Sequence, residues 1–178
     1  GLLWIAHNGG ISSYDGRNYR HYTNPEQISP GMSGLCEDSR GRIWCYNFNG
    51  QVWYVEKGQL KLLREYEYEK EPYFPRMDMW EDLLLIPSTR GLFIFDTKTE
   101  KGKYITLSAG ISGVAILQDR AILLSSTGKN NSLNHKWFSF NKKDESVQLI
   151  HEVKGYPSRS PIILQKTVVN NQVFVIQN

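Results

Sequence analysis

The chain has 178 residues, of which 40% are hydrophobic and 12% aromatic, which is enough for a packed core and excludes a disordered chain. Its 21 basic and 18 acidic residues leave a net charge of +3, but the two signs are interspersed, which argues against a nucleic-acid partner. No apolar run reaches the roughly 18 residues that a membrane-spanning helix needs, and no signal peptide is recognisable.

The first predicted element is a hairpin whose strands are the runs 1–6 and 11–15, joined by the Gly-containing turn 7–10. The same strand, turn and strand pattern recurs along the chain, so that successive copies start at residues 1, 41, 82, 120 and 171. The spacings are therefore 40, 41, 38 and 51 residues. A repeat of this length that is built from strands alone predicts β-propeller blades rather than a helical solenoid.

Each complete repeat is predicted to hold four strands. In the second copy these are 33–38, 42–46, 51–56 and 59–65. In the third copy they are 76–80, 83–87, 92–96 and 103–107, and in the fourth 113–118, 121–125, 136–141 and 147–152, with a longer polar turn through Asn134. The first copy lacks its first strand, and a further pair, 162–169 and 172–176, ends the chain.

One segment, 60–73, has some amphipathic-helix character. The alternation of Glu and Tyr over 65–69 has a period of two, and the repeat requires a strand followed by a loop at this place. We therefore assign the beginning of this segment to the fourth strand of the second copy.

The sequence predicts an all-β fold, a β-propeller fragment of about four four-stranded antiparallel blades. We expect one propeller segment over 1–178, with a partial first blade at 1–30, three further blades at 31–70, 71–109 and 110–156, and the start of a fifth at 157–178. The partial copies suggest a segment of a longer multidomain protein. Four blades with unpaired edges are expected to self-associate through edge strands or exposed blade faces, which sedimentation would detect.

The two cysteines, Cys36 and Cys45, lie on either side of a tight turn. With a three-residue turn, Asp38 faces Arg42 and Cys36 faces Trp44, so the two thiols point to opposite faces of the sheet. We then expect two free, buried thiols. A change of register by one residue would instead place them opposite each other.

Five apolar side chains occupy equivalent points of the repeat, and we expect each to fill the space between neighbouring blades rather than to stack on a ligand. These structural core residues are Trp4, Trp44, Leu85, Leu123 and Phe174. Gly10, Gly50 and Gly91 stand in the turn between the second and third strands, where a positive φ is needed.

One stretch resembles a known family. The run Glu37-Asp38-Ser39-Arg40-Gly41-Arg42-Ile43-Trp44, followed by a Gly-containing turn and an aromatic–Asp pair as in Tyr14-Asp15 and Phe95-Asp96, is similar to the two-component regulator propeller repeat. This chain departs from that pattern with Tyr46-Asn47 after the tryptophan strand, and with Leu85, Leu123 and Phe174 in place of tryptophan.

The resemblance implies a ligand-sensing module from the extracytoplasmic, periplasmic region of hybrid two-component sensor histidine kinases in glycan-degrading gut bacteria. Such regions sense oligosaccharides from polysaccharide breakdown and signal through a membrane helix to a kinase. None of that signalling machinery is in this chain.

No catalytic signature is found. The Gly-Lys pair of 125–130 lacks the other residues of a phosphate-binding loop, and the turn 47–50 lacks the carboxylates of a calcium loop. The four histidines do not have metal-ligand spacing. We therefore expect no catalytic residue, no metal and no cofactor.

In propellers with this strand order, the turns between second and third strands and the loops between repeats converge on one face. The candidate ligand-binding residues in these turns are His7, Asn8, Asn47, Asn49, Arg90, Lys129 and Asn130. Turn geometry explains Asn without any ligand, but it does not require a cation at Arg90 or Lys129. These donors suit sugar hydroxyls and acidic groups, so the sequence predicts an oligosaccharide partner, and an acidic one.

Two other functions stay open. A propeller-type carbohydrate-active enzyme, a lyase or glycosidase, would need paired carboxylates or a His, Tyr and Arg group at the channel, and acidic residues are sparse in the turns. A non-catalytic scaffold propeller is distinguished from a sensor by its lack of glycan binding.

Overall fold

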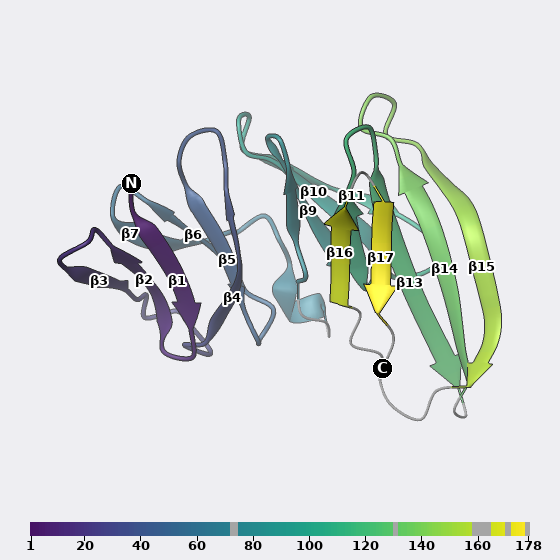
Figure 1. Ribbon diagram of the computed structural model, residues 1–178, viewed down its shortest axis with the longest axis horizontal. Coiled ribbons are helices and arrows are strands. Elements are labelled where there is room, and N and C mark those ends of the chain that lie inside the picture. Colours follow the sequence, from purple (N-terminus) through teal and green to yellow (C-terminus); the bar gives the residue numbers. More distant parts are fainter. Residues whose placement is uncertain (72–74, 130–131, 158–164, 170–171, 177–178) are drawn as a thin grey trace. The chain divides into compact units, whose positions relative to one another are not determined.

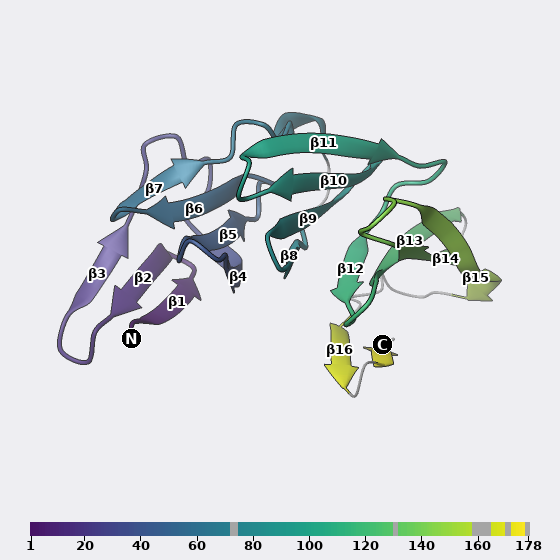
Figure 2. The same ribbon diagram turned by 90° about the horizontal axis from the view of Figure 1, so that it is seen from above.

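The computed structural model of the protein describes residues 1–71, 75–129, 132–157, 165–169 and 172–176. These residues form seventeen strands and one short 3-10 helix, η1, and the strands pair into five sheets (Figures 1 and 2). The pairing recorded within the sheets is antiparallel and follows the order of the chain. This confirms the predicted all-β class and its propeller-type organisation. None of the described helices is long and apolar enough to cross a membrane.

The first sheet has three strands, β1 (Leu3–His7), β2 (Gly10–Tyr14) and β3 (Tyr19–Tyr22). The second has four, β4 (Met32–Glu37), β5 (Ile43–Asn47), β6 (Val52–Glu56) and β7 (Gln59–Leu62). The helix η1 (Tyr68–Lys70) comes before the third sheet, which holds β8 (Asp78–Trp80), β9 (Leu83–Ser88), β10 (Gly91–Asp96) and β11 (Lys101–Thr106).

The fourth sheet contains β12 (Gly113–Ile116), β13 (Ala121–Lys129), β14 (Ser132–Phe140) and β15 (Val147–Pro157). The pair β16 (Gln165–Val169) and β17 (Gln172–Ile176) makes the last sheet. Gly10, Gly50 and Gly91 have φ values of 138°, 87° and 132°, as the turn geometry predicted.

Several predicted strand boundaries are wrong, including the end of the strand predicted at 147–152, which runs to Pro157. The strand predicted at 59–65 ends at Leu62, and a 3-10 helix follows at Tyr68–Lys70. The cause is tertiary, because Leu63 and Tyr66 are buried and the Tyr66 ring packs 5.4 Å from that of Phe93 on β10. On a continuous strand Leu63 and Tyr66 would point to opposite faces of the sheet, so the chain leaves the strand where both are buried.

The polar turn predicted through Asn134 is also wrong. Strands β13 and β14 stay paired from Ala121 opposite Phe140 to Lys129 opposite Ser132, and Asn134 lies opposite Thr127 within this ladder. Thr127 and Asn134 are both exposed on the sheet surface, and Thr is common in strands, so polarity alone does not end a strand.

The described chain divides into two compact units. Unit 1 comprises residues 1–86 and 93–103, and unit 2 comprises residues 87–92 and 104–178. The boundary runs through the third sheet, so the turn between β9 and β10 belongs to unit 2.

The core of unit 1 lies between successive sheets. One cluster joins the first two sheets and contains Ile11, Tyr22, Met32, Ile43, Cys45, Trp53, Val55 and Leu60, with Trp4, Ala6 and Leu62 at its margin. On β5 the side chains alternate, so Ile43 and Cys45 join this cluster while Trp44 points the other way, 5.6 Å from the Phe95 ring on β10. Both faces of β5 are therefore covered, one by the first sheet and the other by the third.

The apolar side chains at equivalent repeat positions are buried or half-buried where the structure describes them. Trp44, Leu85 and Leu123 are fully buried, and Trp4 is half-buried against the core cluster. The side chain of Phe174 lies outside the described part of the chain.

The register between β4 and β5 places Cys36 opposite Trp44, and both cysteines are free, as predicted. Cys45 is buried, whereas Cys36 is half-buried rather than fully buried. Burial raises the pKa of each thiol to about 12, with Asp78 and Asp38 adding to the effect at Cys36. Both therefore stay protonated at neutral pH and serve as small apolar side chains.

Candidate functional site

One end of unit 1 is built from two turns and a loop. We call it the turn face, comprising residues 7–10 between β1 and β2, 47–51 between β5 and β6, and the loop 23–31 before β4. They meet at Gly31, where an added Cβ would lie 3.4 Å from the Phe48 ring and 3.5 Å from the carbonyl oxygen of Asn8. Within this unit, the predicted convergence of turns and loop is present.

A pair of buried amides holds the turn face in shape. Asn47 Nδ2 donates to the carbonyl oxygen of Ser29 (3.2 Å) and to Gln51 Oε1 (2.7 Å), and Asn47 Oδ1 accepts the backbone N–H of Gln51 (3.0 Å). Gln51 Nε2 donates to the carbonyl oxygen of Glu26 (2.9 Å). Both side chains are buried, so Asn47, predicted as a ligand contact, instead ties the loop 23–31 to the turn.

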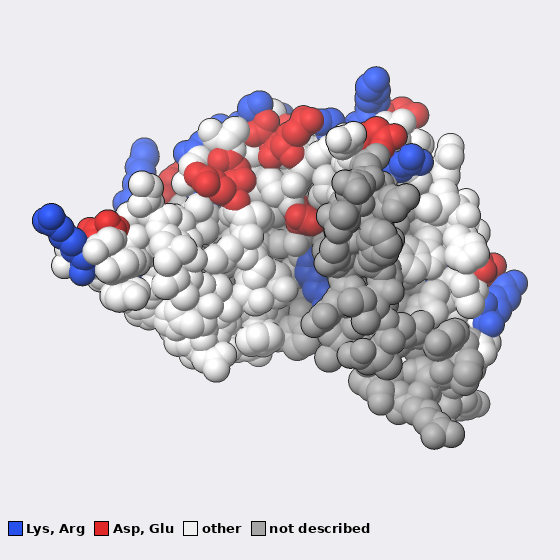
Figure 3. All heavy atoms as spheres, viewed as in Figure 1, with Lys and Arg blue, Asp and Glu red and all other residues white. Residues whose placement is uncertain are grey.

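Several side chains of the turn face are exposed to solvent. Asn8 and Asn49 are exposed, and so are Ile28 and Phe48, the latter with 53% of its surface accessible. The lower margin of unit 1, where the turn between β1 and β2 lies, shows no charged side chain in the view of Figure 3, whereas charges line its upper margin. Sequence reasoning missed Phe48, although an apolar aromatic at the apex of a turn is no more required by turn geometry than a cation is.

His7 is held by hydrogen bonds at both of its ring nitrogens. The backbone N–H of Gly9 donates to His7 Nδ1 (3.1 Å), so the neutral ring carries its hydrogen on Nε2, which lies 3.0 Å from Ser12 Oγ. Ser12 Oγ also lies within hydrogen-bond distance of His21 Nδ1, at 3.0 Å. The N–H from Gly9 opposes metal binding through Nε2, because that would require the other tautomer.

Arg90 belongs to unit 2 and stands in the turn between β9 and β10. Its guanidinium lies 3.7 Å from the centroid of the Tyr104 ring. The loop after β11 packs beside this turn, since the backbone N–H groups of Leu107 and Ile111 donate to the carbonyl oxygens of Arg90 and Ser88, both at 2.9 Å. The side chain of Lys129 and all of Asn130 lie outside the described part of the chain. His7, Asn8, Asn47 and Asn49 thus share the turn face of unit 1, and Arg90 is part of unit 2.

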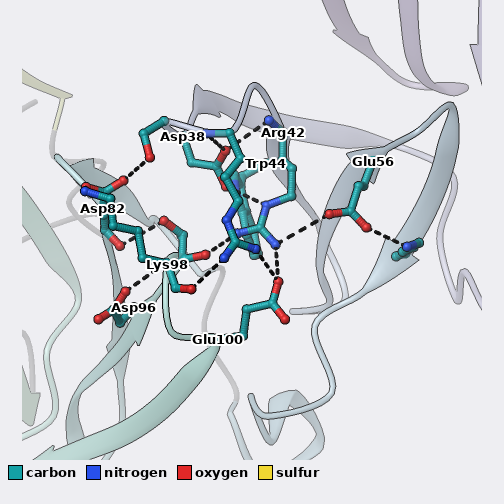
Figure 4. Close-up of polar contacts among 12 residues, drawn as sticks. Asp38, Arg42, Trp44, Glu56, Asp82, Asp96, Lys98 and Glu100 are labelled. Atoms are coloured by element: carbon teal, nitrogen blue, oxygen red, sulfur yellow. Dashed lines mark hydrogen bonds and ion pairs between the residues drawn. The ribbon is translucent and has the colours of Figure 1, made fainter.

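The other end of unit 1 carries an ion-pair cluster around Asp38, Arg42, Trp44 and Glu100 (Figure 4). Asp38 Oδ2 accepts hydrogen bonds from Arg42 Nε (2.7 Å) and Trp44 Nε1 (2.8 Å). Arg42 Nη1 donates to Glu100 Oε1 (2.8 Å) and Arg42 Nη2 to the carbonyl oxygen of Thr97 (2.6 Å). The side chains of Asp38 and Arg42 are 0% and 3% exposed, so the ion pair is buried.

Electrostatics in this cluster favour the charged forms. Burial alone raises the pKa of Asp38, but the hydrogen bonds from Trp44 and Arg42 outweigh it and hold that pKa below its usual range. Burial likewise lowers the pKa of Arg42, and its bonds to Asp38 and Glu100 reverse the effect. Because these bonds run from the turn after β4 to the residues between β10 and β11, the cluster ties the second sheet to the third and is structural.

Among the described residues, no group of three or more His, Cys, Asp or Glu side chains is arranged to hold a metal ion.

No protein-family model matches the chain, and no curated protein matches it in sequence. Among solved structures, it is similar to the computationally designed Ika8 protein, with 11% identity and a TM-score of 0.62 over 98% of this chain and 52% of that one. It is similar to the N-terminal domain of Nup159, with 13% identity and a TM-score of 0.59 over 98% of this chain and 49% of that one.

A third similar structure is the extracellular domain of the putative hybrid two-component system BT4673 from B. thetaiotaomicron. The identity is 20% and the TM-score 0.57, over 98% of this chain and 25% of that one. At these identities the likeness shows a shared fold alone. The chain spans about half the length of the first two structures and a quarter of the third.

Proposed function

We propose that this chain is part of a ligand-sensing propeller of a two-component sensor outside the cytoplasm, and that an oligosaccharide binds at the turn face of unit 1. The run from Glu37 to Trp44, which resembles the two-component regulator propeller repeat, supports the sensor role. The fold that the chain shares with an extracellular two-component domain is in line with it. A kinase outside this chain would receive the signal.

The exposed ring of Phe48 is the observation that carries the site. Pyranose rings present C–H groups that pack on aromatic faces, while their hydroxyls bond to amides and imidazoles. Phe48 stands 53% exposed beside Asn8, Asn49 and the loop 23–31. The buried Asn47–Gln51 pair holds this turn rigid, so little entropy is lost when a sugar packs on the ring.

The alternative of a glycosidase is less well supported. That chemistry needs two carboxyl groups roughly 5–10 Å apart. The turn face contains one acidic residue in its sequence, Glu26, and Arg64 Nη2 donates to its Oε1 at 2.6 Å. We therefore propose binding without turnover.

Replacing Phe48 with alanine is expected to weaken oligosaccharide binding about tenfold or more, because burying an aromatic face contributes about 1.5–3 kcal/mol. The measurement is calorimetric titration of the protein against neutral and acidic oligosaccharides. Since Phe48 is exposed, the melting temperature of the Phe48→Ala variant should differ little from that of the wild type. Tyr19→Ala, at another exposed aromatic residue 70% accessible on β3, is the matched control and should leave binding unchanged.

Three outcomes decide between the functions. Equal affinity in wild type and the Phe48→Ala variant would remove the site assignment. No binding by any oligosaccharide would favour a scaffold, and cleavage products after incubation would favour an enzyme.

A further inference from the structure

We propose that the groove between the outer strands β3 and β7 of unit 1 binds an oxyanion, a sulfate, phosphate or carboxylate group, with Arg20 as its principal contact. This outer groove is lined by residues 20–24 and 58–61 and has a volume of about 410 Å³. Its lining includes the buried residues Tyr22 and Leu60, and the others are mostly polar. The volume is within the range of small-ligand pockets, roughly 300–1,000 Å³.

Two side chains cross the groove and hold its walls in place. Arg20 Nη2 donates to the carbonyl oxygen of Gly58 (2.9 Å), and Asn24 Nδ2 donates to the carbonyl oxygen of Leu60 (2.9 Å). Gly58 has a φ of 75°, and a Cβ there would lie 2.5 Å from Arg20 Nη2. The positive φ favours glycine at position 58, and a larger residue there would also push the Arg20 guanidinium away from the Gly58 carbonyl.

The charge of the groove selects an anion. Its lining contains Arg20 and Lys61 and no aspartate or glutamate. Lys61 Nζ is bonded to Glu56 Oε2 (2.7 Å), which leaves Arg20 as the main uncompensated charge, 5.1 Å above the Tyr22 ring. The turn face lacks such a cation, so the two sites differ in chemistry.

The guanidinium keeps most of its donors for a ligand. An arginine has five N–H donors, and the described residues accept only one bond from Arg20, at the Gly58 carbonyl. One complete edge of the planar group thus remains for a bidentate bond to an oxyanion.

The test is titration of the protein with inorganic sulfate, phosphate and acetate at constant ionic strength. The two readouts are the melting temperature and the NMR shifts of residues 20–24. We expect each bound anion to raise the melting temperature relative to chloride. Arg20→Gln should lose at least tenfold in affinity, and Lys61→Gln about two- to threefold. Arg17→Gln, at an exposed arginine three residues away on the turn between β2 and β3, should retain full binding.

Equal losses of anion affinity in the Arg20→Gln and Arg17→Gln variants would overturn the proposal. So would the absence of any NMR shift at residues 20–24 when the anion is added. If Arg20→Gln does not fold, Arg20→Lys keeps the charge without the planar edge, and its affinity should fall while some binding remains. A sulfated disaccharide, its desulfated counterpart and an unsulfated uronic acid then distinguish the sources of the oxyanion. Phe48→Ala should leave sulfate binding unchanged, so failure of one site does not count against the other.

Discussion

Replacing Trp44 with alanine is expected to lower the free energy of unfolding by about 3–5 kcal/mol, as for other large aromatic residues removed from a core. The indole is 0% exposed and packs 4.7 Å from the ring of Tyr54 and 5.6 Å from that of Phe95. Its removal leaves a cavity between the second and third sheets. It also takes a hydrogen-bond donor from the buried carboxylate of Asp38.

Urea unfolding of the wild type and the Trp44→Ala variant, followed by circular dichroism, measures this difference. Trp44→Phe keeps most of the apolar volume and removes the N–H group, so it should lose about 1.5–3 kcal/mol, the usual contribution of a hydrogen bond to a charged group. Tyr19→Ala, at an exposed ring, is the control. A loss below about 1 kcal/mol for Trp44→Ala would mean that the indole is not in the core.

Replacing Asp38 with asparagine is expected to destabilise the protein by about 3–5 kcal/mol at pH 7, because it leaves the buried Arg42 guanidinium without its closest counter-charge. Two carboxylates remain near Arg42 Nη1, Glu100 at 2.8 Å and Glu56 at 3.8 Å, but their side chains are 53% and 26% exposed. Asp119→Asn removes an exposed ion pair with Arg120 and should lose at most about 1 kcal/mol. If Asp38→Asn and Asp119→Asn lowered the free energy of unfolding by the same small amount, the Asp38–Arg42 pair would not stabilise the fold.

The same pair predicts a dependence on pH. The folded pKa of Asp38 lies below its unfolded value near 3.8, so its stabilisation is fully present above that value and is lost as pH falls through the folded pKa. The difference in unfolding free energy between wild type and Asp38→Asn should therefore be constant from pH 7 to about pH 5 and should shrink at lower pH. A difference that stayed constant down to about pH 2.5 would contradict this assignment.

The strands and their order followed from local patterns in the sequence. Apolar alternation, Gly-containing turns and a repeat near 40 residues are properties of adjacent residues, and the three-residue turn after Asp38 set the register of Cys36 opposite Trp44. Such features need no distant partner, which is why most strands lie within a few residues of the predicted positions. The strand over 59–65 failed where a distant partner intervened, since Tyr66 packs on Phe93.

The chemistry of the turns, by contrast, was decided by the tertiary structure. Asn8, Asn47 and Asn49 are alike in sequence, yet Asn47 is buried because the backbone of the loop 23–31 comes within reach of its amide. Arg20 meets its glycine partner across 38 positions of sequence, so no local pattern pointed to the outer groove. A side chain's exposure depends on which remote backbone packs over it. The sequence therefore determined where the turns are, and the packing of the sheets decided which of their side chains are available to a ligand.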